Sequence, residues 1–290
     1  MGLPDHLVRG VTESSSLRVT CAVTRSVVEE ARRRHKLVLG TTVALGKALT
    51  SGLLLATLTK NLERVTVQLA GDGPIGRVTV DANGSGDVRG YVTYPEAEAQ
   101  RSDLLLGRIG VVNVTRDLGL RDLYQGQVSL TTGEVDEDIE AYLRISEQVP
   151  SALGCEVAVV DGKMCAAGIL VQALPGGDPQ LVREVQHALR TGRFRELVLG
   201  GEQTAQQLAA GLVGEEPIEW LDERPVQFAC PCSDGRITNM LRMLPPTELD
   251  EMAAADKPAE IICNFCNAVY LVERAELEEI RRQVAPRESN

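Results

Sequence analysis

Two short cysteine pairs near the end of the chain carry the clearest chemistry in the sequence. Cys230 and Cys232 are separated by one residue, Cys263 and Cys266 by two, and 30 residues lie between the pairs. Two such pairs, brought together by a loop of this size, can place four sulfurs at the corners of a tetrahedron, which is the geometry of closed structural zinc sites. The spacing therefore predicts a four-thiolate Zn²⁺ site that needs no histidine.

The same four thiols allow different interpretations of what the metal does. In the simplest, zinc permanently staples a small structural or interaction module. In a second, the site is a redox switch, because zinc holds its ligands as thiolates and the thiolate is the form that oxidants attack. Oxidation that joins near neighbours, Cys230 to Cys232 and Cys263 to Cys266, would expel the metal and unfold a module that depends on it. A third interpretation is a thiol–disulfide oxidoreductase that uses the C-x-x-C pair, although the usual strand-then-helix setting of that motif is missing from the pattern.

The remaining motifs that could do chemistry are weak. Two glycine-rich stretches do not fit a phosphate-binding loop: residues 40–47 lack the Ser or Thr that follows Gly-Lys in a P-loop, and residues 71–76 precede a strand rather than a helix. No nucleophile motif accompanies the histidines, which we expect to be exposed or half-buried: His6, His35 and His187. We expect the other cysteines to be small buried residues in strands: Cys21, Cys155 and Cys165. The sequence therefore predicts no catalytic residues and no enzyme.

Composition narrows the classes of partner. The 290-residue chain has a net charge of −11, a pI near 4.9 and 3% aromatic residues, which argues against nucleic acid, because nucleic-acid binding relies on clustered Lys and Arg with aromatic platforms. The longest uncharged runs, residues 164–177 and 48–59, are shorter than the roughly 20 residues that cross a bilayer. The N-terminus lacks the pattern of a signal peptide. We therefore expect a cytoplasmic protein with no membrane partner, in a compartment that keeps clustered thiols reduced.

The first 177 residues predict one α+β domain with a large, mostly antiparallel sheet. Segments in which apolar residues alternate with polar ones predict its strands: 17–24, the three strands of a meander over 64–93, 111–115, 127–132, and a hairpin over 155–173. Helices are predicted at residues 26–35 and 135–148. A further helix that begins after Thr41 or Thr42 is almost entirely apolar, so we expect it to be buried at the centre of the domain.

The rest of the chain predicts a linker and a small metal-dependent domain. Residues 175–179 (PGGDP) mark a boundary, because paired prolines and glycines cannot readily continue a helix or strand. Residues 178–227 predict a metastable helical linker, since its helices are short and polar and must pack on a neighbour to stay folded. Residues 228–290 predict a C-terminal zinc-binding redox-switch domain. At roughly 60 residues its core is too small for comfortable stability, so metal binding would decide whether it folds.

The cysteine pattern, at the C-terminus of a chain of this length, resembles the 33 kDa chaperonin family, the redox-regulated holdase chaperones. The resemblance covers nearly the whole chain. Further segments similar to that family are 71–76 (GDGPIG), 88–92 (VRGYV), 124–126 (YQG) and 142–148 (YLRISEQ).

The resemblance implies an ATP-independent chaperone that binds unfolded client proteins and prevents their aggregation under oxidative stress. It implies an inactive, reduced form in which Cys230, Cys232, Cys263 and Cys266 bind zinc. In the oxidised form, the implied disulfides Cys230–Cys232 and Cys263–Cys266 replace the metal. The resemblance also implies that the linker, here about residues 178–227, unfolds on oxidation and that the active protein is a homodimer.

Overall fold

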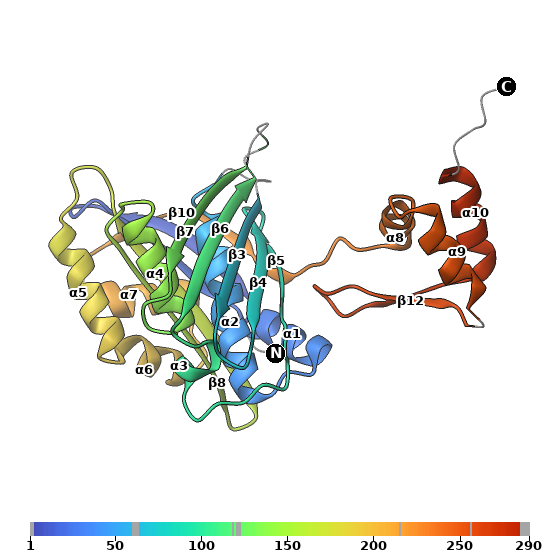
Figure 1. Cartoon of the computed structure of the whole chain (residues 1–290). Coiled ribbons are helices and arrows are strands. Elements are labelled where there is room, and N and C mark those ends of the chain that lie inside the picture. Colours follow the sequence, from blue (N-terminus) through green and yellow to red (C-terminus); the bar gives the residue numbers. More distant parts are fainter. Residues whose placement is uncertain are drawn as a thin grey trace. The chain divides into compact units, whose positions relative to one another are not determined.

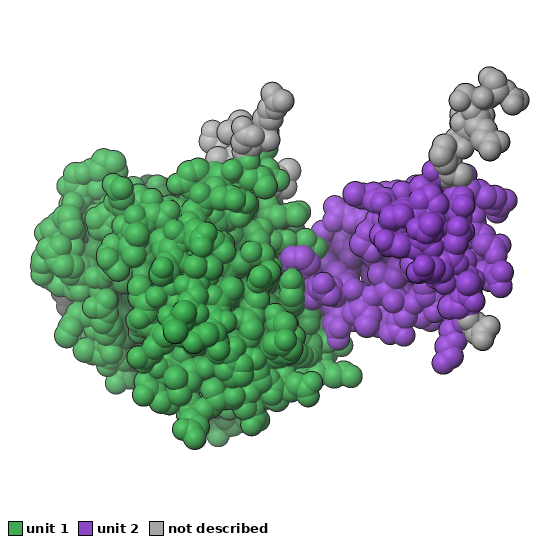
Figure 2. All heavy atoms as spheres, viewed as in Figure 1, with its two compact units in different colours: residues 1–229 green, residues 230–290 purple. Residues whose placement is uncertain are grey.

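The computed structural model describes residues 3–59, 64–117, 119, 123–214, 216–255 and 257–284. The chain divides into two compact units, Met1–Ala229 (unit 1) and Cys230–Asn290 (unit 2), shown in Figure 2. The boundary lies directly before the first cysteine of the C-terminal cluster. Each unit has a hydrophobic core of its own.

Within the described part of unit 1, the strands form two sheets. Sheet A is antiparallel, in the order β10 (Ile218–Pro225), β1 (His6–Thr12), β2 (Leu17–Val23), β9 (Lys163–Ala173), β8 (Ser151–Val160). Sheet B is antiparallel apart from its first pair, in the order β11 (Gln227–Phe228), β5 (Asp87–Val92), β4 (Arg77–Asn83), β3 (Arg64–Gly71), β6 (Gly110–Asp117), β7 (Tyr124–Ser129). The expected α+β class is confirmed, with the strands divided between two sheets instead of forming one.

Helix α2 (Leu39–Ala56) lies between the two sheets and joins them into one core (Figure 1). Leu49 lies against Gly90 of β5 in sheet B, whereas Leu54 lies against Gly168 of β9 in sheet A. By length and hydropathy α2 could cross a membrane, but 78% of this segment is buried inside the protein. The expectation of a buried apolar helix at the centre of the domain is therefore confirmed.

Three further helices surround α2. α1 (Arg25–His35) packs against α2 and β9, α3 (Ser102–Leu106) against α2 and β3, and α4 (Val135–Ile145) against α2, β7 and β8. The loop that leads into α4 is closed by Asp138, a fully buried carboxylate. Its oxygens accept hydrogen bonds from three backbone N–H groups: Thr131, Thr132 and Gly133. This arrangement gives the buried charge the donors that it needs.

The segment expected to be a linker packs on the outer face of sheet A, opposite α2. Helices α5 (Pro179–Arg190), α6 (Arg193–Leu199) and α7 (Ala205–Val213), here called the linker helices, contact β1, β2, β8 and β9 (Figure 1). An apolar cluster lies between them and the sheet. The same segment then supplies β10 to the edge of sheet A and β11 to the edge of sheet B. The short helices expected within residues 178–227 are present as α5, α6 and α7, and residues 178–229 belong to unit 1 in this structure.

Unit 2 packs its helices around a short hairpin. Its elements are α8 (Asp234–Leu241), α9 (Pro246–Ala254), β12 (Ala259–Ile262), β13 (Val269–Val272) and α10 (Arg274–Val284). Strands β12 and β13 pair antiparallel. Among the described residues of this unit, few apolar residues form the buried core: Ile237, Leu241, Leu249, Val272, Leu277 and Ile280. Such a small core supplies only modest stability.

Replacement of Leu49 by alanine is expected to lower the free energy of unfolding of unit 1 by about 2 to 5 kcal/mol, because it leaves a cavity between α2 and sheet B. Urea denaturation followed by circular dichroism measures this loss. The matched control is Leu39→Ala at the start of the same helix, where the side chain is 62% exposed. Its free energy of unfolding should change by about 0.5 kcal/mol or less, as is typical of surface sites. Equal losses in the two variants would contradict the central position of α2.

Candidate functional site

The four predicted metal ligands come together in unit 2. Cys230 and Cys232 lie in the segment between β11 and α8, and Cys263 and Cys266 lie in the turn between β12 and β13. Their sulfur atoms all lie within 4.8 Å of one another, and this is the one such group of possible ligands among the residues that the structure describes. Cys230 Sγ lies 3.8 Å from Cys263 Sγ, and Cys232 Sγ lies 3.2 Å from Cys266 Sγ. We call these four residues the cysteine cluster.

A tight turn positions the second cysteine pair. Across the β12–β13 hairpin, the Cys263 N–H donates to the Ala268 carbonyl at 2.9 Å. Asn267 has a left-handed backbone with φ 56°, and its N–H donates to the Cys263 carbonyl at 2.7 Å. Asparagine tolerates this conformation better than most residues with a side chain. The turn therefore brings Cys263 and Cys266 close together.

Helix α8 positions the first pair. Ser233, next to Cys232, is the N-cap of this helix, and its side chain accepts the Arg236 N–H. Ile237 and Leu241 on the same helix are buried in the core of unit 2. Cys232 is therefore attached to an element that packing holds in place.

The cysteine cluster fits zinc. With Zn–S bonds of about 2.3 Å, a tetrahedral centre separates its sulfurs by about 3.8 Å, and the sulfur separations in this structure are compatible with that geometry. Four thiolates are soft ligands, which favour zinc over hard cations such as Mg²⁺ and Ca²⁺. All seven cysteines of the chain are unbridged, so all four thiols of the cluster can ligate.

The ionised forms of the cluster's thiols need a cation to stabilise them. Burial raises the pKa of the Cys266 thiol and that of the Cys263 thiol, which disfavours their ionised forms. A hydrogen bond with Cys232 raises the pKa of Tyr270, a neighbour that the sequence pattern did not identify. A bound divalent cation reverses this balance, because it stabilises several adjacent thiolates at once.

The remaining cysteines lie in sheet A of unit 1. Cys21 on β2 and Cys155 on β8 are buried, as expected, whereas Cys165 on β9 is only half-buried. Burial raises the pKa of both the Cys21 and the Cys155 thiol. These two thiols are therefore poor candidates for reaction with oxidants, which attack the thiolate.

His6 is buried, contrary to the expectation of an exposed or half-buried ring. Its Nε2 accepts the Ala205 N–H at 3.0 Å, and its Nδ1 lies 2.9 Å from the Pro4 carbonyl. Both contacts are satisfied by a neutral ring that carries its proton on Nδ1. His6 therefore connects β1 to the N-terminus of α7, a structural role that depends on residues far apart in sequence.

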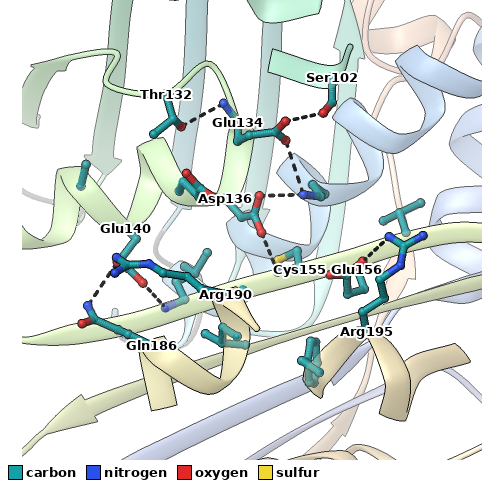
Figure 3. Close-up of a pocket in the computed structure, with 18 of the residues that line it drawn as sticks. Ser102, Thr132, Glu134, Asp136, Glu140, Cys155, Glu156, Gln186, Arg190 and Arg195 are labelled. Atoms are coloured by element: carbon teal, nitrogen blue, oxygen red, sulfur yellow. Dashed lines mark hydrogen bonds and ion pairs between the residues drawn. The ribbon is translucent and has the colours of Figure 1, made fainter. Parts of the chain in front are cut away.

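A polar cavity of about 630 Å³ lies between the linker helices and the rest of unit 1 (Figure 3). Glu140 on α4 accepts a hydrogen bond from Gln186 on α5 at 3.1 Å and lies 3.7 Å from the Arg190 guanidinium. Glu156 on β8 pairs with Arg195 on α6 at 3.3 Å. These polar contacts thus join α5 and α6 to the rest of unit 1 beside the apolar cluster on sheet A.

Two carboxylates of this cavity are held in an environment that disfavours their charge. Burial raises the pKa of Glu140 and that of Glu156. Deeper in the cavity, Lys47 of α2 donates to Asp136 at 2.9 Å. Sequence reasoning missed this cavity because its charged residues come from separate segments and form no local motif.

Replacement of Cys266 by serine is expected to weaken zinc binding by about 100-fold or more, since removal of even an outer partner of a metal ligand costs about 10- to 100-fold. It should also unfold unit 2 while unit 1 stays folded. Competition with a chromophoric chelator measures the affinity, and limited proteolysis reports the folding of each unit. Cys165→Ser is the matched control and should retain wild-type affinity; an unchanged affinity in Cys266→Ser would refute the assigned ligand set.

The chain is similar to known proteins over almost its whole length. A family model described as "Hsp33 protein" matches residues 5–273. The 33 kDa chaperonins of Bacillus licheniformis and Bacillus subtilis are 36% and 34% identical; the matches cover 97% and 96% of this chain and 100% and 99% of the relatives. The crystal structure of the 33 kDa chaperonin (heat shock protein 33 homolog) from Thermotoga maritima matches with a TM-score of 0.87 at 29% identity, over 97% of this chain and 99% of that one.

These matches include both sheets, the linker helices and the cysteine cluster. The curated relatives are named chaperonins, a class of proteins that are not enzymes, in agreement with the prediction from the sequence. The extent of the match, rather than any one motif, identifies the protein: the chain belongs to the Hsp33 family of heat-shock chaperones.

Proposed function

We propose that this protein is a redox-regulated, ATP-independent holdase. The reduced, zinc-bound form is inactive, and oxidation to two disulfides releases the metal and activates binding of unfolded proteins. Membership of the Hsp33 family supports the chaperone role. One observation carries the proposed regulation: the cysteine cluster begins at Cys230, directly after the segment 178–229 that covers the apolar outer face of sheet A.

The cysteine cluster is the proposed sensor. Cys266 is buried and the other three cysteines are half-buried, so an oxidant reaches the cluster through those three. Formation of the Cys230–Cys232 and Cys263–Cys266 disulfides removes two electrons per pair, and each pair reduces one molecule of peroxide to water. The disulfides leave no thiolates to bind the metal, so zinc leaves.

Loss of zinc is expected to unfold unit 2. Structural zinc contributes on the order of 10 to 16 kcal/mol in small zinc-binding peptides. A core of the size found in unit 2 rarely supplies more than about 3 to 5 kcal/mol. The metal contribution is the larger of the two, so the oxidised unit cannot hold its fold.

The linker helices cover the proposed client surface. The outer face of sheet A presents apolar side chains that are fully buried in this structure, among them Val8, Val19, Ile169 and Val171. Helices α5, α6 and α7 contain 12, 7 and 9 residues, no more than the roughly 12 to 15 that an isolated helix needs to be even marginally stable. They therefore stay helical only while they are docked, and undocking exposes the apolar face.

Unfolding of unit 2 favours this undocking. The docked segment joins unit 2 through β11, which contains only two residues and pairs only with β5 among the described strands. A disordered chain beyond Ala229 gains conformational freedom when β11 and then β10 detach. Oxidation and mild unfolding conditions such as heat would then act together to release the linker helices.

The setting of the C-x-x-C pair argues against an oxidoreductase. Cys263 and Cys266 lie in a hairpin turn between two strands, whereas redox dithiols of that spacing use a helix N-terminus to stabilise the attacking thiolate. We further propose that the protein works in the cytoplasm, binds unfolded clients rather than nucleic acid, and forms a homodimer when oxidised.

Hydrogen peroxide at elevated temperature is expected to release zinc from the reduced protein, lower its helicity and start suppression of client aggregation. A chromogenic zinc reagent, circular dichroism and light scattering from a chemically denatured client measure the three changes. Cys165→Ser should respond like the wild type. Zinc release without holdase activity would refute the proposal, and thiols that resist peroxide while zinc stays bound would indicate a permanently stapled interaction module.

Replacement of Glu156 by glutamine is expected to strengthen docking of α6 at neutral pH. Lys47, Asp136 and Arg195 face this carboxyl, and because burial raises its pKa in the docked state, the docked protein binds the proton more tightly than the undocked one. Protonation of Glu156 therefore stabilises the docked state. In the wild type this stabilisation is absent at neutral pH, and it grows as pH falls through the raised pKa towards the ordinary value near 4.5. Hydrogen exchange of α6 should therefore be slower in the variant at pH 7, with the difference vanishing near the ordinary value.

The control for this measurement is Glu184→Gln, on the exposed face of α5. It should leave the exchange of α6 unchanged at both pH values. Faster exchange in Glu156→Gln at pH 7 would show that the ion pair with Arg195 outweighs the cost of burying the charge.

A further inference from the structure

Strand β10 closes an edge of sheet A that would otherwise be open. It pairs antiparallel with β1 and with no other described strand. Along β10, half-buried residues alternate with exposed ones, and three of its eight positions are acidic: Glu219, Asp222 and Glu223. Charged side chains of this kind keep an exposed edge from pairing with other chains.

A glycine in β1 forms a seat for the one tryptophan of the chain. Gly10 is paired with Trp220, and the register shifts at this point. A Cβ added to Gly10 would lie 2.6 Å from the Glu219 carbonyl oxygen, 2.7 Å from Ile218 Cγ2 and 3.0 Å from Trp220 Cε3. Gly10 thus leaves room for the ring, which packs against the apolar cluster of sheet A together with Ile218.

Release of the linker would open this seat. Residues 218–225 belong to the segment that we propose to detach, so the outer N–H and C=O groups of β1 would lose their partners. Unpaired edge groups are a ready template for another extended chain. The outer edges of β7 and β8 have no partner strand among the described residues even in the closed form, so the β1 edge differs from them in being covered until the linker leaves.

We propose that the β1 edge, once β10 has detached, binds an extended segment of an unfolded client as a replacement strand, with an aromatic side chain of that segment seated on Gly10. Before activation, β10 therefore occupies the place on the β1 edge that the client strand takes afterwards. Two apolar residues of β10 occupy alternating positions, since Trp220 lies opposite Gly10 and Ile218 lies opposite Thr12. The preferred client segment therefore carries apolar side chains at alternating positions, one of them aromatic. The inference rests on the proposed function, because it requires release of residues 178–229.

Synthetic peptides test the inference without altering the fold. The probe is a fluorescein-labelled peptide with the sequence of residues 218–225 (IEWLDERP), added to the full-length protein in its reduced and its oxidised, heat-activated forms. Fluorescence anisotropy should show binding to the oxidised form alone. A peptide with serine in place of tryptophan should bind about tenfold more weakly or worse, as is usual when an aromatic anchor is removed.

Backbone pairing is tested by N-methylation. Two further peptides carry N-methyl groups at positions taken from the β1–β10 register on each side of the shift at Gly10. In one peptide the methyl groups meet the β1 edge, and in the other they point away from it. The first should lose binding and the second should retain it. Equal binding of the two would overturn the inference, since attraction to the apolar face of the sheet alone does not distinguish the two peptides.

The chain's own strand supplies a second readout. Trp220→Ser should weaken docking of β10, lower the temperature at which oxidised protein becomes active, and tighten binding of the wild-type peptide, because the competing internal strand is weaker. Leu221→Ser, at an exposed position of the same strand, should change none of these. If hydrogen exchange shows that the linker stays docked and no client is held, both proposals fail. If clients are held but the peptides do not bind, only the edge inference fails.

Discussion

Four sulfur atoms within 4.8 Å of one another are the constraint on which unit 2 depends. Neighbouring thiols whose pKa is raised by burial cannot all ionise without a cation, and a core of six buried apolar residues among those described is small for an independent unit. A metal satisfies both demands, because it stabilises the thiolates and ties the segment before α8 to the β12–β13 turn. In the function that we propose, the group most reactive towards oxidants is thereby also the group that holds the unit together.

The linker segment is bound to unit 1 through several weak features rather than one strong one. Its helices are short, its β11 pairing is two residues long, and its polar contacts use Glu140 and Glu156, whose burial is unfavourable to their charge. Against this stand the apolar cluster on sheet A and the seat of Trp220 on Gly10. A balance of this kind suits a segment proposed to leave under stress, because small changes in free energy shift such an equilibrium.

Unit 1 has a contrasting construction that explains how it could survive release of the linker. Helix α2 is covered by sheet A on one side and by sheet B on the other, so its apolar residues form a core that does not include the linker helices. The outer cluster of sheet A is separate from that core. Loss of α5, α6 and α7 would therefore expose one apolar face without opening the centre of the domain.

The sequence by itself determined the features that are local: the four cysteines proposed as metal ligands, recognisable from residue type and spacing, the apolar α2 helix, and the alternating strands that became β2 to β9. It did not predict β1, because Arg9 and Gly10 interrupt the alternation, and Gly10 is explained only by the close approach of β10, whose Ile218, Glu219 and Trp220 leave no room for a Cβ. It predicted that the helices within residues 178–227 pack on a neighbour, but it did not indicate that this neighbour is sheet A or that the same segment adds an edge strand to each sheet. Tertiary structure alone decided these points, because strand pairing, buried charge and ring packing join residues that are distant along the chain and carry no local pattern.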